Sequence, residues 1–331
     1  MTRDPVELRP PGPGIEGELP PPGLGVDRDL PLDAELPPPG PGVDRDLPLD
    51  AHLHTDLSPD SDVPIDAYCA AAVEREIPEL AITDHLDFDP RSPAYAFADF
   101  SRRERLVRQA AERWADRGVA VRFGVEISYE SDHEDEIREH LARHPYDFVI
   151  GSVHVAKHSP YTGRRVAGWV AGKSLEEIVA PYFAEVEAAV RSELFDTLGH
   201  LDYVKKYLVE HVPPVALAAA PHVYEPVLRA LVETGTGLEV NASGLRQAPR
   251  ETYPAAWAVE RFRQLGGSVV TAGSDAHRAH SFAYGLGHVY ATAAAAGFED
   301  VAIRRSPGPV RTLDRVAIPE RLRARRRAEA P

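Results

Sequence analysis

The sequence predicts an α/β fold built around a barrel-like sheet of parallel strands, and three observations support this prediction. From residue 49 onward, short apolar or β-branched segments alternate with longer amphipathic segments. Repeated strand–helix units of this kind are typical of parallel sheets with helical crossovers. The 331-residue chain is 43% hydrophobic, which is enough for a sizeable core. Histidines and carboxylates follow nearly every predicted strand, where a parallel barrel gathers its functional groups.

Seven strands are expected, one fewer than in the common eight-stranded barrel. They span residues 49–53, 80–83, 121–125, 148–153, 197–198, 237–240 and 268–272. Six helices are expected in the connections, at residues 63–76, 99–117, 133–143, 174–192, 222–233 and 255–264. The first helix has Pro64 near its start, and the fourth opens on Ser174 with Glu177 three residues later, which is a capping-box pattern.

The first 48 residues differ in composition from the rest of the chain. They hold 13 of the 31 prolines and no aromatic residue. Such a segment cannot bury enough apolar surface to offset the entropy of ordering, so we predict that it is disordered. Residues 25–34 recur as 42–51, which we interpret as a tandem duplication or an over-extended start, with a proline-rich docking arm as the alternative.

The chain is therefore divided into three regions. A low-complexity segment covers residues 1–48, the barrel covers 49–318, and an arginine-rich tail covers 319–331. We expect the tail to be a solvated, fraying helix without a role of its own.

The net charge and the cysteine content limit the possible binding partners and the cellular compartment. The net charge of −15 argues against a nucleic-acid or anionic-membrane surface. A small anionic substrate remains compatible, because bound divalent metals invert the local field. The single cysteine, Cys69, excludes an internal disulfide and fits a reducing compartment. No run of about 18 apolar residues occurs, so we expect a soluble, cytoplasmic protein; the oligomeric state stays open.

Nine residues with metal-ligating side chains lie at or just after predicted strands. They are His52, His54, Asp60, His85, Glu126, His154, His200, Asp275 and His277. His52 and His54 are two apart in a strand, so their side chains share a face. Glu126 stands in an apolar context, where a buried carboxylate requires a cation. Imidazole and carboxylate are the usual ligands of zinc, manganese and iron, so the pattern predicts a metal-dependent hydrolase.

On these residues, the chain from about 49 to 315 resembles the polymerase and histidinol phosphatase (PHP) superfamily, and most of all its monofunctional histidinol-phosphatases. The motifs that carry the resemblance are His52-Leu53-His54-Thr55, Thr83-Asp84-His85, Gly151-Ser152-Val153-His154, Gly199-His200-Leu201-Asp202 and Gly273-Ser274-Asp275-Ala276-His277, together with Asp60 and Glu126. The likeness to the histidinol-phosphatases rests on softer features, namely Lys205-Lys206-Tyr207 after the fourth of these motifs, and residues 239–246 followed by Tyr253-Pro254.

The resemblance implies a distorted barrel of seven β/α units with two to three divalent ions of zinc, manganese or iron. It assigns one ion to His52, His54, Glu126 and Asp275, a second to Glu126, His154 and His200, and a third to Asp60, His85 and His277. Asp60 stands where some family members have a histidine, which puts the affinity and metal preference of the third position in doubt.

The expected reaction is hydrolysis of L-histidinol phosphate to L-histidinol and phosphate, in histidine biosynthesis. A water that bridges two divalent cations loses a proton near neutral pH and attacks the phosphorus, while the cations neutralise the developing charge. Glu126, Asp275 and His277 are the predicted catalytic residues, and the last two are expected to handle protons besides binding metal.

Four residues are predicted to bind the substrate. Arg164 and Arg165 belong to a basic loop after His154 and are expected to grip the phosphate, with a merely solvated loop as the alternative. Asn241 and Arg246 lie just past the sixth strand. The rival functions are a PHP phosphoesterase for another small phosphate ester or nucleotide, and a non-catalytic PHP module. All nine ligand positions are filled, which disfavours the latter.

Overall fold

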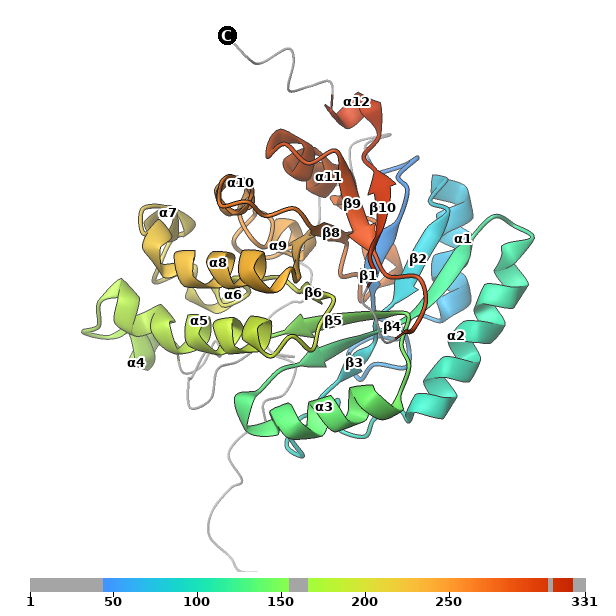
Figure 1. Ribbon diagram of the computed structural model, residues 1–331, viewed down its shortest axis with the longest axis horizontal. Coiled ribbons are helices and arrows are strands. Elements are labelled where there is room, and N and C mark those ends of the chain that lie inside the picture. Colours follow the sequence, from blue (N-terminus) through green and yellow to red (C-terminus); the bar gives the residue numbers. More distant parts are fainter. Residues whose placement is uncertain (1–43, 155–165, 309–311, 324–331) are drawn as a thin grey trace, which may run out of the picture.

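Seven parallel strands form the centre of the protein and pair in the order in which they occur along the chain (Figure 1). They are β1 Asp50–Leu53, β2 Glu79–Ile82, β4 Ala120–Ser128, β5 Phe148–Ser152, β6 Thr197–Leu198, β7 Gly237–Asn241 and β8 Val270–Gly273. The short strand β3, His85–Leu86, pairs with β4. The structure is a computed structural model, and it describes residues 44–154, 166–308 and 312–323.

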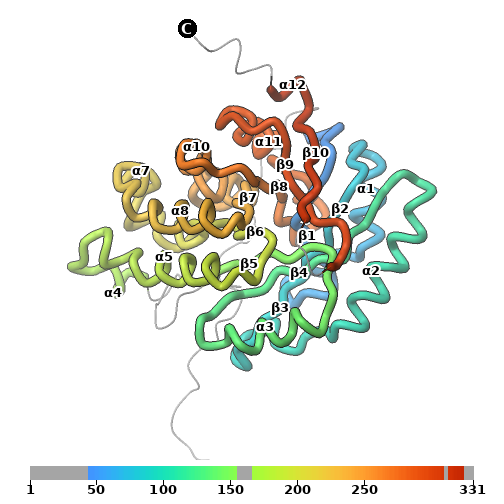
Figure 2. Tube along the Cα trace, viewed as in Figure 1, coloured from blue at the N-terminus to red at the C-terminus, as the bar shows by residue number. Residues whose placement is uncertain are grey.

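The first and last strands of this sheet meet, so that the sheet curls into a barrel (Figure 2). Leu53 forms a parallel bridge with Ala276. The amide of His54 donates to the Ala276 carbonyl at 3.0 Å, and the amide of Asp275 donates to the His52 carbonyl at 2.8 Å. The predicted seven-stranded β/α barrel is therefore confirmed.

The six predicted helices are present and surround the strands (Figure 1). They are α1 Ile65–Arg75, α2 Phe100–Ala115, α3 Glu134–Arg143, α5 Leu175–Arg191, α8 Glu225–Thr234 and α10 Ala256–Gln264. The Ser174 side chain accepts from the amide of Glu177, whose carboxylate accepts from the Ser174 amide, so the predicted capping box is confirmed.

Several elements were not predicted. The connections contain α4 Val166–Val170, α6 Lys205–Leu208, α7 Pro214–Ala218, α9 Ser243–Arg246 and the 3₁₀ turns Ser131–His133, Pro221–Val223 and Ala279–Ser281. After β8 come α11 Leu286–Ala295 and the antiparallel pair β9 Asp300–Ile303 and β10 Asp314–Ala317. The short helix α12, Glu320–Arg323, lies in the tail for which a helix was expected. Helix α11 is buried along most of its length and therefore lacks the one-sided apolar stripe of a surface helix.

Both outer boundaries of the barrel differ from the expected ones. Disorder was expected up to residue 48, but Leu47 is only 1% exposed and the Asp44 carboxylate accepts from the amides of Gly285 and Gly287 at the start of α11. At the other end, α12 buries Leu322 against the core. These short segments are ordered because each has apolar or hydrogen-bonding partners in the barrel. Residues 1–43, with the first copy of the repeat, and 324–331 lie outside the described part.

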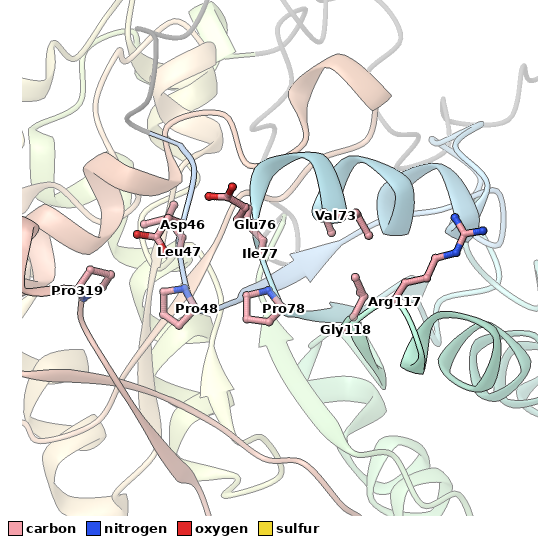
Figure 3. Close-up of a pocket in the computed structure, with 12 residues that line it drawn as sticks. Asp46, Leu47, Pro48, Val73, Glu76, Ile77, Pro78, Arg117, Gly118 and Pro319 are labelled. Atoms are coloured by element: carbon pink, nitrogen blue, oxygen red, sulfur yellow. The ribbon is translucent and has the colours of Figure 1, made fainter.

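A pocket of about 400 Å³ lies at the N-terminal ends of the first strands (Figure 3). Pro48, Pro78 and Val119 line it, and they precede β1, β2 and β4, so the pocket is at the end of the barrel opposite the strand C-termini. None of the nine predicted ligands lines it. Among the described residues, no helix is both long and apolar enough to cross a bilayer.

Candidate metal centre

The nine predicted ligands lie together at the C-terminal end of the barrel. His52 and Glu126 lie within β1 and β4, and His85 begins β3. Four others follow a strand end by one or two residues, namely His54, His154, His200 and Asp275 after β1, β5, β6 and β8. Asp60 and His277 lie farther along, in the loops after β1 and β8. The parallel direction of the strands brings residues separated by more than 200 positions to one face. Donor atoms of seven of them form overlapping groups that can hold metal ions, and the other two, Asp275 and His200, contact His54 and Glu126 of these groups.

The first set combines the histidine pair of β1 with two carboxylates. The Nε2 atoms of His52 and His54 are 3.0 Å apart. Glu126 Oε2 lies 3.3 Å from each of them, and Asp275 Oδ1 lies 3.4 Å from His54 Nε2 and 3.7 Å from His52 Nε2. Glu126 Oε2 is buried and accepts no hydrogen bond. A buried carboxylate oxygen of this kind is costly unless a cation approaches it, so these donors fit a divalent metal.

The second set consists of Glu126, His154 and His200. The Oε1 atom of Glu126 is 2.8 Å from His200 Nε2 and 3.5 Å from His154 Nε2. The Ser152 hydroxyl donates to the same Oε1 at 2.5 Å, and Ser128 Oγ lies 2.9 Å from His154 Nδ1. Glu126 therefore faces the two sets with different oxygens, as a carboxylate shared between two metal ions would.

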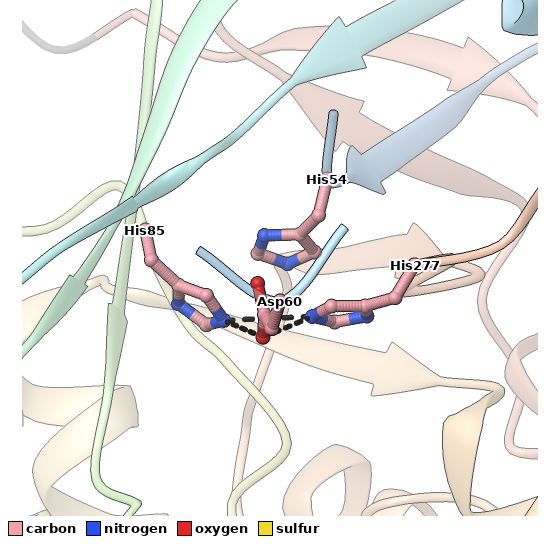
Figure 4. Close-up of side chains that lie close together, drawn as sticks. All are labelled: His54, Asp60, His85 and His277. Atoms are coloured by element: carbon pink, nitrogen blue, oxygen red, sulfur yellow. Dashed lines mark hydrogen bonds and ion pairs between the residues drawn. The ribbon is translucent and has the colours of Figure 1, made fainter. Parts of the chain in front are cut away.

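The third set surrounds the Asp60 carboxylate (Figure 4). Asp60 Oδ2 lies 3.2 Å from His85 Nε2 and 3.0 Å from His277 Nε2. The ring of His54 stacks on that of His277 with centroids 4.0 Å apart, which joins this set to the first. His85 also reaches Glu126, because its Nδ1 is 2.9 Å from Oε2. The distances thus define three adjoining sets of donor atoms, and His85 and His54 each contact residues of two sets.

The loop after β8 holds Asp275 in an unusual backbone conformation. Asp275 has φ 56°, in the left-handed region that non-glycine residues rarely adopt. The guanidinium of Arg246 donates to the carbonyls of Ser274 and Asp275 at 2.8 Å each, and Arg246 is 3% exposed. These hydrogen bonds hold the loop in a conformation that turns the Asp275 carboxylate toward His54.

Imidazoles keep the carboxylates of the cluster ionised. Burial would raise the pKa of Glu126, but the neighbouring rings, with His52 and His85 foremost, hold it well below its usual range. The pKa values of Asp60 and Asp275 are likewise held well below the usual range, against burial, by nearby imidazoles. All three carboxylates are therefore anionic at neutral pH, which is the state that binds a cation.

Of the four predicted substrate-binding residues, two lie beside the ligand cluster and two lie outside the described part of the chain. Asn241 is fully buried and donates through Nδ2 to Asp275 Oδ2 at 3.3 Å, and the guanidinium of Arg246 is bonded to the ligand loop as described. Substrate contact by these two residues stays a prediction. Arg164 and Arg165 lie outside the described residues.

Two features of the site were missed in the sequence. Glu239 of β7 contacts His52 Nδ1 at 2.6 Å, and in the sequence it was noted only as the first residue of the 239–246 segment that carries the resemblance. Lys206 Nζ donates at 2.8 Å to the hydroxyl of Tyr203, whose ring centroid is 4.7 Å from that of His200 and 5.4 Å from that of His154. The Lys205-Lys206-Tyr207 run, noted only as a resemblance, was the available signal for Lys206.

The sequence pattern of the PHP domain matches residues 50–243. The chain belongs to the PHP domain family. The matched range includes seven of the nine ligands, while Asp275 and His277 lie beyond it. The PHP fold and the recognition of the family from its motifs are thus confirmed.

Named relatives share most of their length with this PHP protein. The "Probable histidinol-phosphatase" of Deinococcus radiodurans is 31% identical over 69% of this chain and 85% of its own. The "Histidinol-phosphatase" of Lactococcus lactis is 26% identical over 68% of this chain and 82% of its own. A crystal structure of the Lactococcus lactis histidinol phosphate phosphatase, complexed with zinc, L-histidinol and phosphate, superimposes with a TM-score of 0.64 at 24% identity, covering 78% of this chain and 97% of that one.

Proposed function

We propose that this protein is a divalent-metal-dependent phosphomonoesterase that hydrolyses L-histidinol phosphate to L-histidinol and phosphate, a step of histidine biosynthesis. The observation that carries the proposal is the buried ligand cluster, in which the two Glu126 oxygens lie within 3.5 Å of nitrogens from five imidazoles. Relatives that match most of the chain are named histidinol-phosphatases, and the Lactococcus lactis structure holds zinc, L-histidinol and phosphate together.

The ligand residues fit two to three divalent ions, and we propose zinc, manganese or iron. His52, His54, Glu126 and Asp275 would hold the first, Glu126, His154 and His200 the second, and Asp60, His85 and His277 the third. A donor set of imidazoles and carboxylates without cysteine is compatible with all three metals. When bound, the ions supply positive charge that lowers the pKa of water and neutralises the phosphoryl oxygens.

Proton transfer is assigned to Asp275 and His277. Breaking the phosphorus–oxygen bond of a monoester leaves an alcohol oxygen that must take up a proton. Asp275 Oδ1 lies 3.5 Å from His277 Nδ1, and the His277 side chain is 22% exposed, whereas that of His52 is fully buried. The side chains of His277 and of His154, which is 24% exposed, are thus the members of the cluster most open to solvent, and His277 is the one that also contacts Asp275.

Lys206 is a further proposed contact for the phosphate. Its ammonium sits beside the Tyr203 hydroxyl, and the Tyr203 ring borders His154 and His200. A phosphate held between those histidines would attract a nearby cation. Replacing Lys206 by methionine is expected to raise KM for the phosphate ester about tenfold and to leave the circular dichroism spectrum unchanged.

We also propose a cytoplasmic location and no nucleic-acid partner. The net charge of −15 opposes binding to a phosphate backbone, and the single cysteine, Cys69, is buried and unpaired, as in proteins of reducing compartments.

Release of inorganic phosphate from L-histidinol phosphate tests the proposal. The metal-reconstituted protein is compared with a chelator-treated sample and with a panel of other monoesters, including sugar phosphates and nucleotides. Selective, chelator-sensitive turnover of L-histidinol phosphate is expected. Turnover of other esters with histidinol phosphate ignored would keep the metal chemistry and overturn the substrate, and no chelator-sensitive turnover of any ester would overturn the function.

A further inference from the structure

Glu239 is a buried carboxylate that lies behind the metal ligands. It belongs to β7, is 1% exposed, and its side chain points toward β1 and β6. Within the described part of the chain, its ion-pair partner is the imidazole of His52, with no lysine or arginine beside it. Burial of a carboxylate without a permanent cation is costly, so its hydrogen bonds have to compensate for lost solvation.

Three N–H groups provide those hydrogen bonds. Glu239 Oε1 lies 2.6 Å from His52 Nδ1. Glu239 Oε2 accepts from the backbone amide of His200 at 2.8 Å and from Asn241 Nδ2 at 3.0 Å. Two of the three donors thus belong to metal ligands, one from each of the sets that share Glu126.

The contact at Nδ1 determines what the other nitrogen of His52 can do. His52 Nε2 faces the cluster, 3.3 Å from Glu126 Oε2. A carboxylate acceptor at Nδ1 retains the proton there and leaves the Nε2 lone pair for a metal ion. A hydrogen-bonded carboxylate of this kind also fixes the ring orientation and makes the imidazole a stronger donor.

Gly273 leaves the space that the Glu239 carboxylate occupies, and Gly199 leaves space for the neighbouring Ser152 side chain. A Cβ atom at Gly273 would lie 2.6 Å from Glu239 Oε1 and 2.3 Å from His52 Cβ. A Cβ atom at Gly199 would lie 2.4 Å from Ser152 Oγ and 3.4 Å from Glu239 Oε2. Gly199 precedes His200, and Gly273 precedes the loop that holds Asp275. The lack of a side chain at these two positions lets the neighbouring strands approach closely.

We propose that Glu239 is a positioning residue that fixes the Nδ1–H tautomer of His52 and anchors the backbone of His200. It thereby sets the geometry of two metal positions without itself touching a metal or the substrate. The inference rests on the proposed metal centre and not on the substrate, because metal affinity is measured without any phosphate ester. A failure of L-histidinol phosphate as substrate would therefore leave this inference intact.

The first test is the zinc affinity of Glu239→Gln, measured by competition with a chromophoric chelator. Glutamine keeps the shape of the side chain, but its NH₂ group replaces one carboxylate oxygen. Because both oxygens accept hydrogen bonds from N–H groups, the NH₂ group meets a donor in either orientation. We expect about 10–100-fold weaker zinc binding. Glu79→Gln is the matched control, because Glu79 is also a buried strand carboxylate but pairs with Arg122 and Arg305 instead of metal ligands. Its zinc affinity is expected to equal that of the wild type.

A second measurement separates positioning from general stabilisation. In the zinc-loaded wild type, nitrogen-15 NMR is expected to show one protected Nδ1–H proton that disappears when His52 is replaced and is lost or exchanges rapidly in Glu239→Gln. Glu239→Asp, which keeps the charge but shortens the side chain, is expected to bind zinc with intermediate affinity. It replaces Glu239→Gln as the deciding variant if the glutamine protein does not fold. Wild-type zinc affinity, or an unchanged Nδ1–H signal, in the folded deciding variant would overturn the proposal.

Discussion

Buried carboxylates lie at both ends of the barrel, and they meet different partners at each end. At the N-terminal ends of the strands, Glu79 pairs with Arg122 and Arg305, each at 2.7 Å. There, too, Asp147 is held by both terminal nitrogens of Arg108 at 2.5 and 2.8 Å. A guanidinium stays protonated at every accessible pH and offers only donors, so these pairs are permanent and cannot accept a metal ion.

At the C-terminal ends, the partners of the three predicted ligand carboxylates are imidazoles. Asp60 lies between His85 and His277, and Glu126 faces histidines on all sides. An imidazole can release its proton and present a lone pair, so the same carboxylates gain a cation when the rings become neutral. The counter-ion of a buried carboxylate, rather than its burial, therefore distinguishes a structural pair from a metal site.

Removing a carboxylate from the imidazole end is expected to have the largest effect. Glu126→Gln should lower the rate of phosphate release by about 10²–10³-fold or more, because the shared donor of two metal positions loses its charge. The fold should persist, since the surrounding imidazoles can become neutral. The measurements are kcat/KM with L-histidinol phosphate and the urea unfolding midpoint of the same sample. Wild-type rates in the folded variant would contradict the assignment of Glu126 as a metal ligand.

The opposite outcome is expected at the arginine end. Glu79→Gln leaves Arg122 and Arg305 without their carboxylate, which should cost about 1–3 kcal/mol of unfolding free energy; the range is below that of a fully buried pair because both guanidinium groups are partly exposed. Urea denaturation measures this loss. Chelator-sensitive turnover at saturating metal should stay at the wild-type level, and a marked decrease would show that the two ends of the barrel are coupled.

The buried carboxylate of Asp44 has a third kind of partner, backbone amides. It accepts hydrogen bonds from the amides of Gly285 and Gly287 at the start of α11. Asp44→Ala should cost about 1 kcal/mol, as for the loss of other N-terminal caps. A thermal melt of this variant beside Asp46→Ala, whose carboxylate does not cap α11, measures the effect. Equal melting temperatures for the two variants would show that the hydrogen bonds of the Asp44 carboxylate do not stabilise the start of α11.

The smallest expected effect concerns an imidazole that lacks a carboxylate partner. Burial, with His144 and Arg143 nearby, lowers the pKa of His140 to about 4. Below pH 6.5 the unfolded chain takes up a proton at this residue that the folded protein accepts only near pH 4, so stability falls as the pH is lowered through this window. The loss should be below about 1 kcal/mol because the ring is partly exposed.

Urea denaturation between pH 7 and 4 of wild type and His140→Asn provides the measurement, and the variant should show a shallower decline. Identical pH profiles would mean that His140 is not buried in its neutral form.

Features that depend on local sequence could be predicted, whereas those that depend on distant partners could not. The strands and the ligand cluster were predictable because parallel strands bring their C-termini to one end, so His52 and Asp275 had to converge. The role of Glu239 could not be predicted in this way, because it lies within strand β7 and not after it, and its partner His52 is 187 residues away. Helix α11 was missed because a helix that is buried on most sides has no amphipathic period.

The closure of the barrel between its first and last strands also determines when the site can form during synthesis. The hydrogen bond from the Ser274 amide to the Asp50 carboxylate joins residues that are 224 positions apart. At about 5–20 residues per second, the ribosome needs roughly 10–45 s to make the intervening chain. His52 and His54 thus leave the exit tunnel long before Asp275 exists, and a complete set of ligands is available only to a nearly finished polypeptide. Loading of the full metal centre is therefore a late event in the life of the nascent chain.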